Sequence, residues 1–152
     1  MDYLLSRQVA CVSVLDISGA ALERAKARLG PAHRQVTWIE ADVTGDWGIQ
    51  PVDIWHDRAV FHFLTRADDR QRYRARLGAS VRPGGSVVMA TFGPEGPTMC
   101  SGLPTIRYSP HALAAELGDS YQLQETIPEQ HATPFGTTQE FRYSRLTRVS
   151  ED

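Results

Sequence analysis

Two acidic residues each close an apolar run in the first third of the chain. Asp16 ends a run that begins at Ala10, and Asp42 ends a second run that begins at Gln35. Nearly continuous apolar runs of this length are typical of parallel strands buried on both faces. The carboxyl ends of parallel strands share one edge of a sheet, where open α/β sheets bind ligands, and a carboxylate there can accept hydrogen bonds from a ligand. The alternative for either acid is a structural role as a helix N-cap or turn residue.

A second group of reactive side chains lies within residues 55–64. His56 and His62 are candidate bases, because an imidazole changes its charge near neutral pH. For either histidine the competing interpretation is a ring satisfied by backbone contacts. Arg58 has two candidate partners, its neighbour Asp57 and a negatively charged group of a substrate. The aromatic residues of the segment are more typical of a core than of a cofactor site.

The elements that would position these residues alternate between strands and helices. Strands are predicted over 10–16, 35–42, 52–56 and 86–92. Helices are predicted to begin with Ser18 as an N-cap, with a capping box at 65–68 and with Ser109 before Pro110. Segments 121–127 and 138–148 alternate as strands do, with little room for a helix between them, and so predict an antiparallel hairpin. The order predicts a single α/β domain over residues 1–152, with a mainly parallel sheet flanked by helices.

The connections carry further candidates. Residues 82–85, Arg-Pro-Gly-Gly, predict a turn, and the Gly- and Pro-rich segment 93–103 predicts a functional or mobile loop. Cys100 and Tyr108, in or next to that loop, are candidates for a substrate pocket. His131 and Thr133 are expected in the loop before the last strand. The five arginines of the helix over 65–81 are interpreted as a solvated face.

Composition limits the class of partner. The chain has 152 residues, a formal net charge of −2 and a pI near 6.2, so nucleic acid is not expected as a partner. No apolar run reaches the ~20 residues that a membrane helix needs. The two cysteines form no CxxC pair and the histidines lack metal-ligand spacing, so we expect free thiols and no metal site. A cytoplasmic protein with a small-molecule partner is predicted.

Four short motifs, taken in order, resemble the class I S-adenosylmethionine-dependent methyltransferases. They are Val14-Leu15-Asp16-Ile17-Ser18, Glu40-Ala41-Asp42-Val43, Asp53-Ile54-Trp55-His56-Asp57-Arg58 and Arg82-Pro83-Gly84-Gly85. The terminal hairpin also matches the reversed last strand of that family. The resemblance implies a Rossmann-like fold, S-adenosyl-L-methionine as cofactor and methyl transfer to a small molecule.

The resemblance also implies roles for individual residues. Asp16 would bind the ribose, Ile17 would pack on the adenine, and Asp42 and the Val43 amide would bind the adenine edge. The implied cofactor-binding set is Asp16, Ile17, Ser18, Asp42, Val43, His56 and Asp57. Asp57, Arg58 and His62 are the implied catalytic residues, with Asp57 attracting the positive sulfonium. The sequence Asp57-Arg58-Ala59 is similar to an Asp-Arg-Gly element of the branch that methylates thiols and other chalcogen compounds.

The chain departs from the family at its start. Family members begin with a strand and a glycine-rich turn, and nothing of the kind precedes Asp16. That strand would lie between those ending at Asp16 and His56, so two inner edges are expected to lack a partner. Direct pairing of these edges, rearrangement of residues 1–8, or a second chain would satisfy them. A homodimer is the expectation.

Two functional classes follow from this truncated pattern. One is an enzyme whose activity is weak because the glycine-rich motif is missing. The other is a non-catalytic module that binds S-adenosylmethionine or S-adenosylhomocysteine, or a truncated relic. A dinucleotide-dependent dehydrogenase is a third and weaker interpretation, which the Arg-Pro-Gly-Gly turn and the terminal hairpin disfavour.

Overall fold

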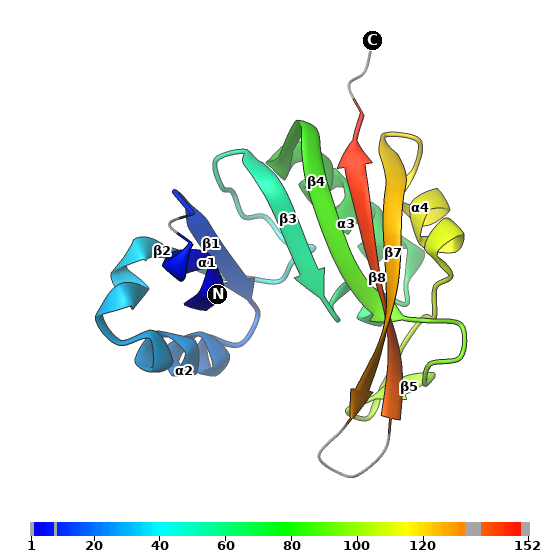
Figure 1. Ribbon diagram of the computed structural model, residues 1–152, viewed down its shortest axis with the longest axis horizontal. Helices are drawn as coiled ribbons and strands as arrows, with labels where there is room; N and C mark the ends of the chain where they lie inside the picture. The colour runs from blue at the N-terminus through cyan, green and yellow to red at the C-terminus, as the bar shows by residue number, and fades with distance from the viewer. Residues whose placement is uncertain (1, 8, 133–137, 150–152) are drawn as a thin grey trace. The chain divides into compact units, whose positions relative to one another are not determined.

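The computed structural model describes residues 2–7, 9–132 and 138–149, and the chain divides into two compact units, residues 1–49 and 50–152 (Figure 1). The boundary falls between the second and third strands. Each unit has its own sheet, so each is described by itself. The prediction of a single domain stays a prediction.

The first unit is a small parallel βαβ arrangement. It contains α1 (Asp2–Ser6), β1 (Val12–Asp16), α2 (Gly19–Leu29), the 3₁₀ helix η1 (Gly30–Gln35) and β2 (Val36–Glu40). β1 and β2 pair in parallel register, from Val12 opposite Val36 to Asp16 opposite Glu40. The predicted N-cap is confirmed, because Ser18 Oγ accepts a hydrogen bond from the Ala21 amide at 3.2 Å.

The second unit is built on a four-stranded mixed sheet. Its strands are β3 (Val52–Arg58), β4 (Val81–Phe92), β7 (Tyr121–Ala132) and β8 (Thr138–Arg148), in the order β3-β4-β8-β7. β3 and β4 are parallel, whereas β8 is antiparallel to both β4 and β7. The predicted terminal hairpin is therefore confirmed. A small antiparallel hairpin of β5 (Met99–Cys100) and β6 (Leu103–Pro104) follows β4.

Two helices cover one face of this sheet. α3 (Ala67–Ser80) and α4 (Pro110–Leu117) lie on the same side of it in Figure 1, and the 3₁₀ helix η2 (Phe61–Phe63) precedes them. The buried core beneath them includes Tyr73, Leu77, Met89, Leu113 and Leu146. The α/β class and the flanking helices are thus confirmed.

The arginines of α3 were expected to form a solvated face, and this is wrong for two of them. Arg70 pairs with Glu116 of α4 at 3.0 Å and donates to the carbonyls of Leu64 and Thr65. Arg74 donates to the Glu116 carbonyl at 2.7 Å. These arginines join α3 to α4, because the helices lie close enough for long side chains to reach across.

Three local predictions differ from the structure. The N-cap of α3 is Arg66, without a side-chain hydrogen bond, so the capping box at 65–68 is not formed. The predicted turn at residues 82–85 lies inside β4, where the register with β3 jumps from Val81 to Ser86 and the extra residues bulge out. His131 lies in β7 rather than in a loop, and Thr133 lies outside the described residues.

The two expected unpaired edges are present in the described part of the chain. Within the first unit β1 pairs with β2 alone, and within the second unit β3 pairs with β4 alone. Asp2–Ser6 is helical and supplies no strand. None of the described helices combines the length and apolar character that a membrane span requires.

Candidate functional site

The carboxyl end of β1 presents a carboxylate with one oxygen engaged. Asp16 Oδ1 accepts a hydrogen bond from the Ser18 amide at 2.8 Å, which fixes the turn into α2. Among the described residues, Asp16 Oδ2 has no hydrogen-bond partner. Next to it Ile17 is 70% exposed, an apolar side chain open to a flat partner. This edge can therefore both accept hydrogen bonds and pack against a ring.

The end of β2 lies beside the same edge. The Ala41 amide donates to the Asp16 carbonyl at 3.1 Å, so the turn that follows β2 begins next to the end of β1. Asp42 Oδ1 accepts from both the amide and the hydroxyl of Thr44 at 2.8 Å, so this acid has a turn-forming role. The Val43 amide has no acceptor within the described residues.

The end of β3 carries a buried carboxylate in the second unit. Asp57 is 5% exposed; its Oδ1 accepts from the Val60 amide at 3.0 Å and its Oδ2 from the Tyr73 hydroxyl at 2.6 Å. The Trp55 indole donates to the same Tyr73 hydroxyl at 3.0 Å. Burial raises the pKa of Asp57, and its hydrogen bonds oppose that rise. The carboxylate therefore holds the turn after β3 onto α3.

Arg58 lies on the opposite face of the sheet from Asp57, because adjacent residues of a strand alternate. Its Nε donates to the Tyr143 hydroxyl of β8 at 3.0 Å. Its Nη2 lies 4.0 Å from Glu129 Oε1 of β7. The candidate pairing of Arg58 with Asp57 is therefore wrong, because the two side chains lie on opposite faces of the sheet. His56 is exposed on the same face as Arg58.

His62 is fully buried among aromatic rings. The centroid of its ring lies 4.6 Å from that of Phe63 and 4.5 Å from that of Phe92. Nδ1 accepts from the Phe92 amide at 3.2 Å, and Nε2 has no partner among the described residues. Burial lowers the pKa of His62 to about 4, so the ring is neutral near pH 7.

The candidates of the loop after β4 are spread over different environments. Cys100 is half-buried and packs against the cluster of Ala90, Phe92 and Phe141. Cys11 and Cys100 are both free thiols. Tyr108 is buried, which raises the pKa of its phenol to about 12.

Known proteins share this arrangement of elements. No family profile matches the chain. Proteins of Mycobacterium bovis and Mycobacterium tuberculosis, each named an uncharacterized methyltransferase, are 30% identical to it over 89 residues, which is 58% of this chain and 43% of theirs. The chain covers less than half the length of these relatives.

Solved structures extend the likeness to almost the whole chain. An S-adenosylmethionine-dependent methyltransferase of Methanosarcina mazei superposes with a TM-score of 0.76 at 12% identity, covering 99% of this chain and 88% of its own. The N-methyltransferase NodS of Bradyrhizobium japonicum, bound to S-adenosylhomocysteine, gives 0.70 at 14%, covering 98% and 74%. The 1,6-didemethyltoxoflavin-N1-methyltransferase of Burkholderia thailandensis gives 0.72 at 18%, covering 97% and 65%.

These similarities show that the chain has the fold of S-adenosylmethionine-dependent methyltransferases. The Rossmann-like fold class is thereby confirmed. In the first unit the fold brings Asp16, Ile17 and Ser18 together with the turn that carries Asp42 and Val43. In the second unit it separates Asp57 and His62, which are buried, from His56 and Arg58, which are exposed.

Sequence reasoning missed several residues at these strand ends. Glu40 lies opposite Asp16 in the β1–β2 register, and its Oε2 would be 2.6 Å from a Cβ at Gly19, so glycine leaves room for that carboxylate at the start of α2. The strand-end position of Glu40 was the signal for it. Tyr143 and Tyr73 gave no local signal, since each reaches the site from a distant element.

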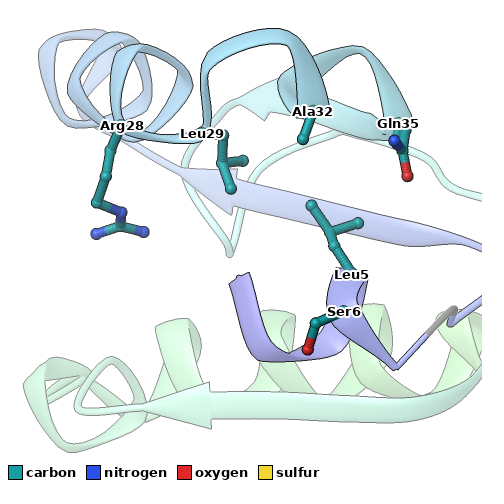
Figure 2. A pocket seen from close by; sticks show the side chains of 6 residues that line it. All are labelled: Leu5, Ser6, Arg28, Leu29, Ala32 and Gln35. Atoms are coloured by element: carbon teal, nitrogen blue, oxygen red, sulfur yellow. The ribbon is translucent and has the colours of Figure 1, made fainter.

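A hollow of the first unit lies away from this edge. A hollow of about 500 Å³ opens between α1, α2 and η1, lined by Leu5, Ser6, Arg28, Leu29, Ala32 and Gln35 (Figure 2). α2 runs back from the carboxyl end of β1, so its last residues lie at the amino ends of the strands. Ligands of open α/β sheets bind at the other edge.

Proposed function

We propose that the chain binds S-adenosyl-L-methionine and serves methyl transfer to a small-molecule acceptor. The observation that carries this proposal is the pair of unsatisfied groups at one edge of the first unit, Asp16 Oδ2 and the Val43 amide, beside the exposed Ile17. The chemistry of an adenosine matches it. Ribose hydroxyls donate to the carboxylate, the adenine ring packs on the apolar side chain, and a ring nitrogen accepts from the amide.

In the adenosine half, Asp16 is the ribose acceptor and Ser18 keeps its carboxylate in place. Ile17 and Val43 bind the adenine. For Asp42 we propose that it shapes the turn that presents the Val43 amide, since Thr44 already uses Oδ1. The adenine amino group remains a proposed additional partner of the Asp42 carboxylate.

For the methyl end we propose residues near the end of β3 in the second unit, on the family resemblance of Asp57-Arg58-Ala59 alone. Bound S-adenosylmethionine would supply an electrophilic methyl group. His56 and Arg58, exposed on one face, are available to cofactor and acceptor, whereas Asp57 shapes this end through Val60 and Tyr73. The buried, neutral His62 is proposed to support Phe92 rather than to collect a proton.

A thiol is the acceptor class that fits this site best. A thiol with an ordinary pKa near 8.5 is a few per cent thiolate at pH 7, and the thiolate is a strong nucleophile without a dedicated base. Orientation alone then supplies much of the rate enhancement. The likeness of Asp57-Arg58-Ala59 to the thiol-methylating element supports the same class.

The alternative function is a cofactor-binding module without catalysis. The burial of His62 and the engagement of both Asp57 oxygens favour it, because they leave the end of β3 with few reactive groups. For both the enzyme and the binding module we propose a homodimer, in which the second copy covers the unpaired edges of β1 and β3.

Calorimetric titration with S-adenosylmethionine and S-adenosylhomocysteine tests the proposal. Asp16→Ala should lose roughly 1.5–3 kcal/mol of binding free energy, the range for a hydrogen bond to a charged group. Asp119→Ala, an exposed acid between α4 and β7, should bind as the parent does. Parent-like binding by both Asp16→Ala and Asp42→Ala would place the cofactor elsewhere.

A methyl-transfer assay with thiol, amine, carboxylate and hydroxyl acceptors then separates enzyme from module. Product above the uncatalysed rate with the thiol supports the enzyme and its acceptor class. Cofactor binding without product from any acceptor supports the module.

A further inference from the structure

One row of residues crosses the open face of the four-stranded sheet, opposite α3 and α4. Arg58 of β3 pairs in register with Ala90 of β4, which pairs with Tyr143 of β8. Ala90 is fully buried, and Arg58 Nε reaches the Tyr143 hydroxyl at 3.0 Å. Two residues 85 positions apart in the sequence thus form one polar unit.

The guanidinium of Arg58 is also held from the side. Its Cζ lies 5.8 Å from the centroid of Phe141, which is 5% exposed, so the cation is supported by a fixed ring. Ala59 and Cys100 pack against the cluster that contains Phe141. A rigid aromatic support reduces the freedom that an arginine loses when it binds a ligand.

Hydrogen-bonding capacity remains on this pair. The Tyr143 oxygen accepts from Arg58, and its own proton has no acceptor among the described residues. Arg58 Nη1 has no partner in the same part of the chain. Roughly half of the Arg58 side chain is exposed, so a ligand can reach these donors.

Glu129 is the internal competitor for an anion at this place. Its Oε1 lies 4.0 Å from Arg58 Nη2, and both side chains are more than 40% exposed. An exposed pair at this separation is worth at most about 1 kcal/mol. A planar carboxylate that meets the guanidinium through two short, parallel hydrogen bonds interacts more strongly.

We infer that Arg58 and Tyr143 form a subsite for a carboxylate group of the methyl acceptor, with Phe141 supporting the guanidinium and Glu129 tuning its charge. The inference rests on the proposed function, since it names the acceptor of that site. It restricts the acceptor to small molecules that carry a carboxylate as well as the atom that is methylated.

Binding of benzoate and of benzamide, its neutral counterpart, tests the subsite by NMR titration of the whole chain without cofactor. The parent should bind benzoate at least tenfold more tightly than benzamide. Arg58→Gln should remove this preference and Tyr143→Phe should reduce it severalfold. Glu129→Gln should tighten benzoate binding severalfold, because it removes the competing carboxylate.

Arg145→Gln is the matched control. Arg145 lies on the same face of β8 as Tyr143 and pairs with Glu125 of β7 at 3.3 Å. The Arg145→Gln variant therefore removes the same charge as Arg58→Gln, but outside the proposed subsite. Its benzoate affinity should stay within twofold of the parent. Equal binding of benzoate and benzamide, or equal losses in Arg58→Gln and Arg145→Gln, would overturn the inference.

Glu129→Gln and Tyr143→Phe keep the test decisive if Arg58→Gln unfolds. Cofactor binding measured on the same samples distinguishes the two proposals. Cofactor binding without a preference for benzoate would overturn the carboxylate subsite and leave the proposed function standing. A benzoate preference without cofactor binding ends the proposed function and leaves a carboxylate site.

Discussion

The hydroxyl of Tyr73 donates a 2.6 Å hydrogen bond to Oδ2 of Asp57, joining α3 to the end of β3 inside the core. Both groups are buried, and a buried polar group without a hydrogen-bond partner destabilises the fold. The bond between them gives each group such a partner. Asp57 also accepts a hydrogen bond from the Val60 amide, so the same carboxyl group fixes the turn that follows β3.

Asp57→Asn should change how stability depends on pH. Because the folded-state pKa of Asp57 is raised from 3.8, the folded chain keeps this proton to higher pH than the unfolded chain. The stability it contributes is complete below 3.8 and is lost as the pH rises through the raised value. The unfolding free energy of Asp57→Asn, relative to the parent, should therefore increase with pH across that window.

Denaturant unfolding at several pH values between 4 and 7 measures this difference. Asp57→Ala provides the contrast. It removes the same titrating group but also leaves the Tyr73 hydroxyl and the Val60 amide buried without their acceptor, so it should be about 1–3 kcal/mol less stable than Asp57→Asn at every pH. A pH-independent difference between Asp57→Asn and the parent would contradict the raised pKa.

His62→Phe should remove a pH dependence of the opposite sign. With a folded-state pKa lowered from 6.5 to about 4, His62 contributes stability that is complete above 6.5 and is lost as the pH falls towards 4. The loss amounts to at most about 3.5 kcal/mol, at about 1.4 kcal/mol per pKa unit. Unfolding at pH 5 and pH 7 measures it. His111→Gln, on an exposed position of α4, should keep the parental dependence.

Ala59→Gly should leave the fold as stable or make it more stable. Ala59 has φ of 64°, in the left-handed region that costs a non-glycine residue about 1–2 kcal/mol. The added freedom of glycine in the unfolded chain offsets about 0.5–1 kcal/mol of that gain. Ala75→Gly, at an exposed position in α3, is the control and should lose about 0.5–1 kcal/mol. Equal losses in thermal unfolding would contradict the strain at Ala59.

Arg70→Ala should destabilise the second unit more than Arg72→Ala. Both arginines lie in α3 and pair with an acid, but the Arg70 side chain is 16% exposed whereas that of Arg72 is 57% exposed. Loss of the charged hydrogen bonds of Arg70 should cost about 1.5–3 kcal/mol. The exposed Arg72 pair should contribute at most about 1 kcal/mol. Chemical unfolding of both variants measures the two losses of stability. Equal losses would contradict the view that Arg70 joins α3 to α4.

The proposed homodimer predicts a mass of twice 16.9 kDa by sedimentation at micromolar concentration. The reason is that β1 and β3 each pair on one side within the described residues, and an unpaired strand edge is a template for pairing with another chain. Ile54→Lys on β3 should weaken the dimer, since lysine discourages strand pairing at an edge. Ile127→Lys, at a position of β7 that is also exposed, should not weaken it. A mass near 16.9 kDa throughout would contradict the dimer.

Several elements of the fold could be predicted from the sequence, because each of them depends on residues that are neighbours in the chain. The run that ends at Asp16, the Ser18 cap and the terminal hairpin each depend on residues close together in the chain. The same patterns placed Asp16, Ile17 and Val43 at one edge of the first unit. Strand alternation alone also requires Asp57 and Arg58 to lie on opposite faces.

Only the tertiary structure decided which of those two faces is buried and what each side chain contacts. α3 and α4 cover the side of Asp57, so that carboxylate bonds to Tyr73 and becomes part of the core. Arg58 is left on the open face with Tyr143, 85 residues away. Hydrogen bonds over such separations depend on the order of the strands in the sheet, and that order is set by packing of distant segments rather than by any local pattern.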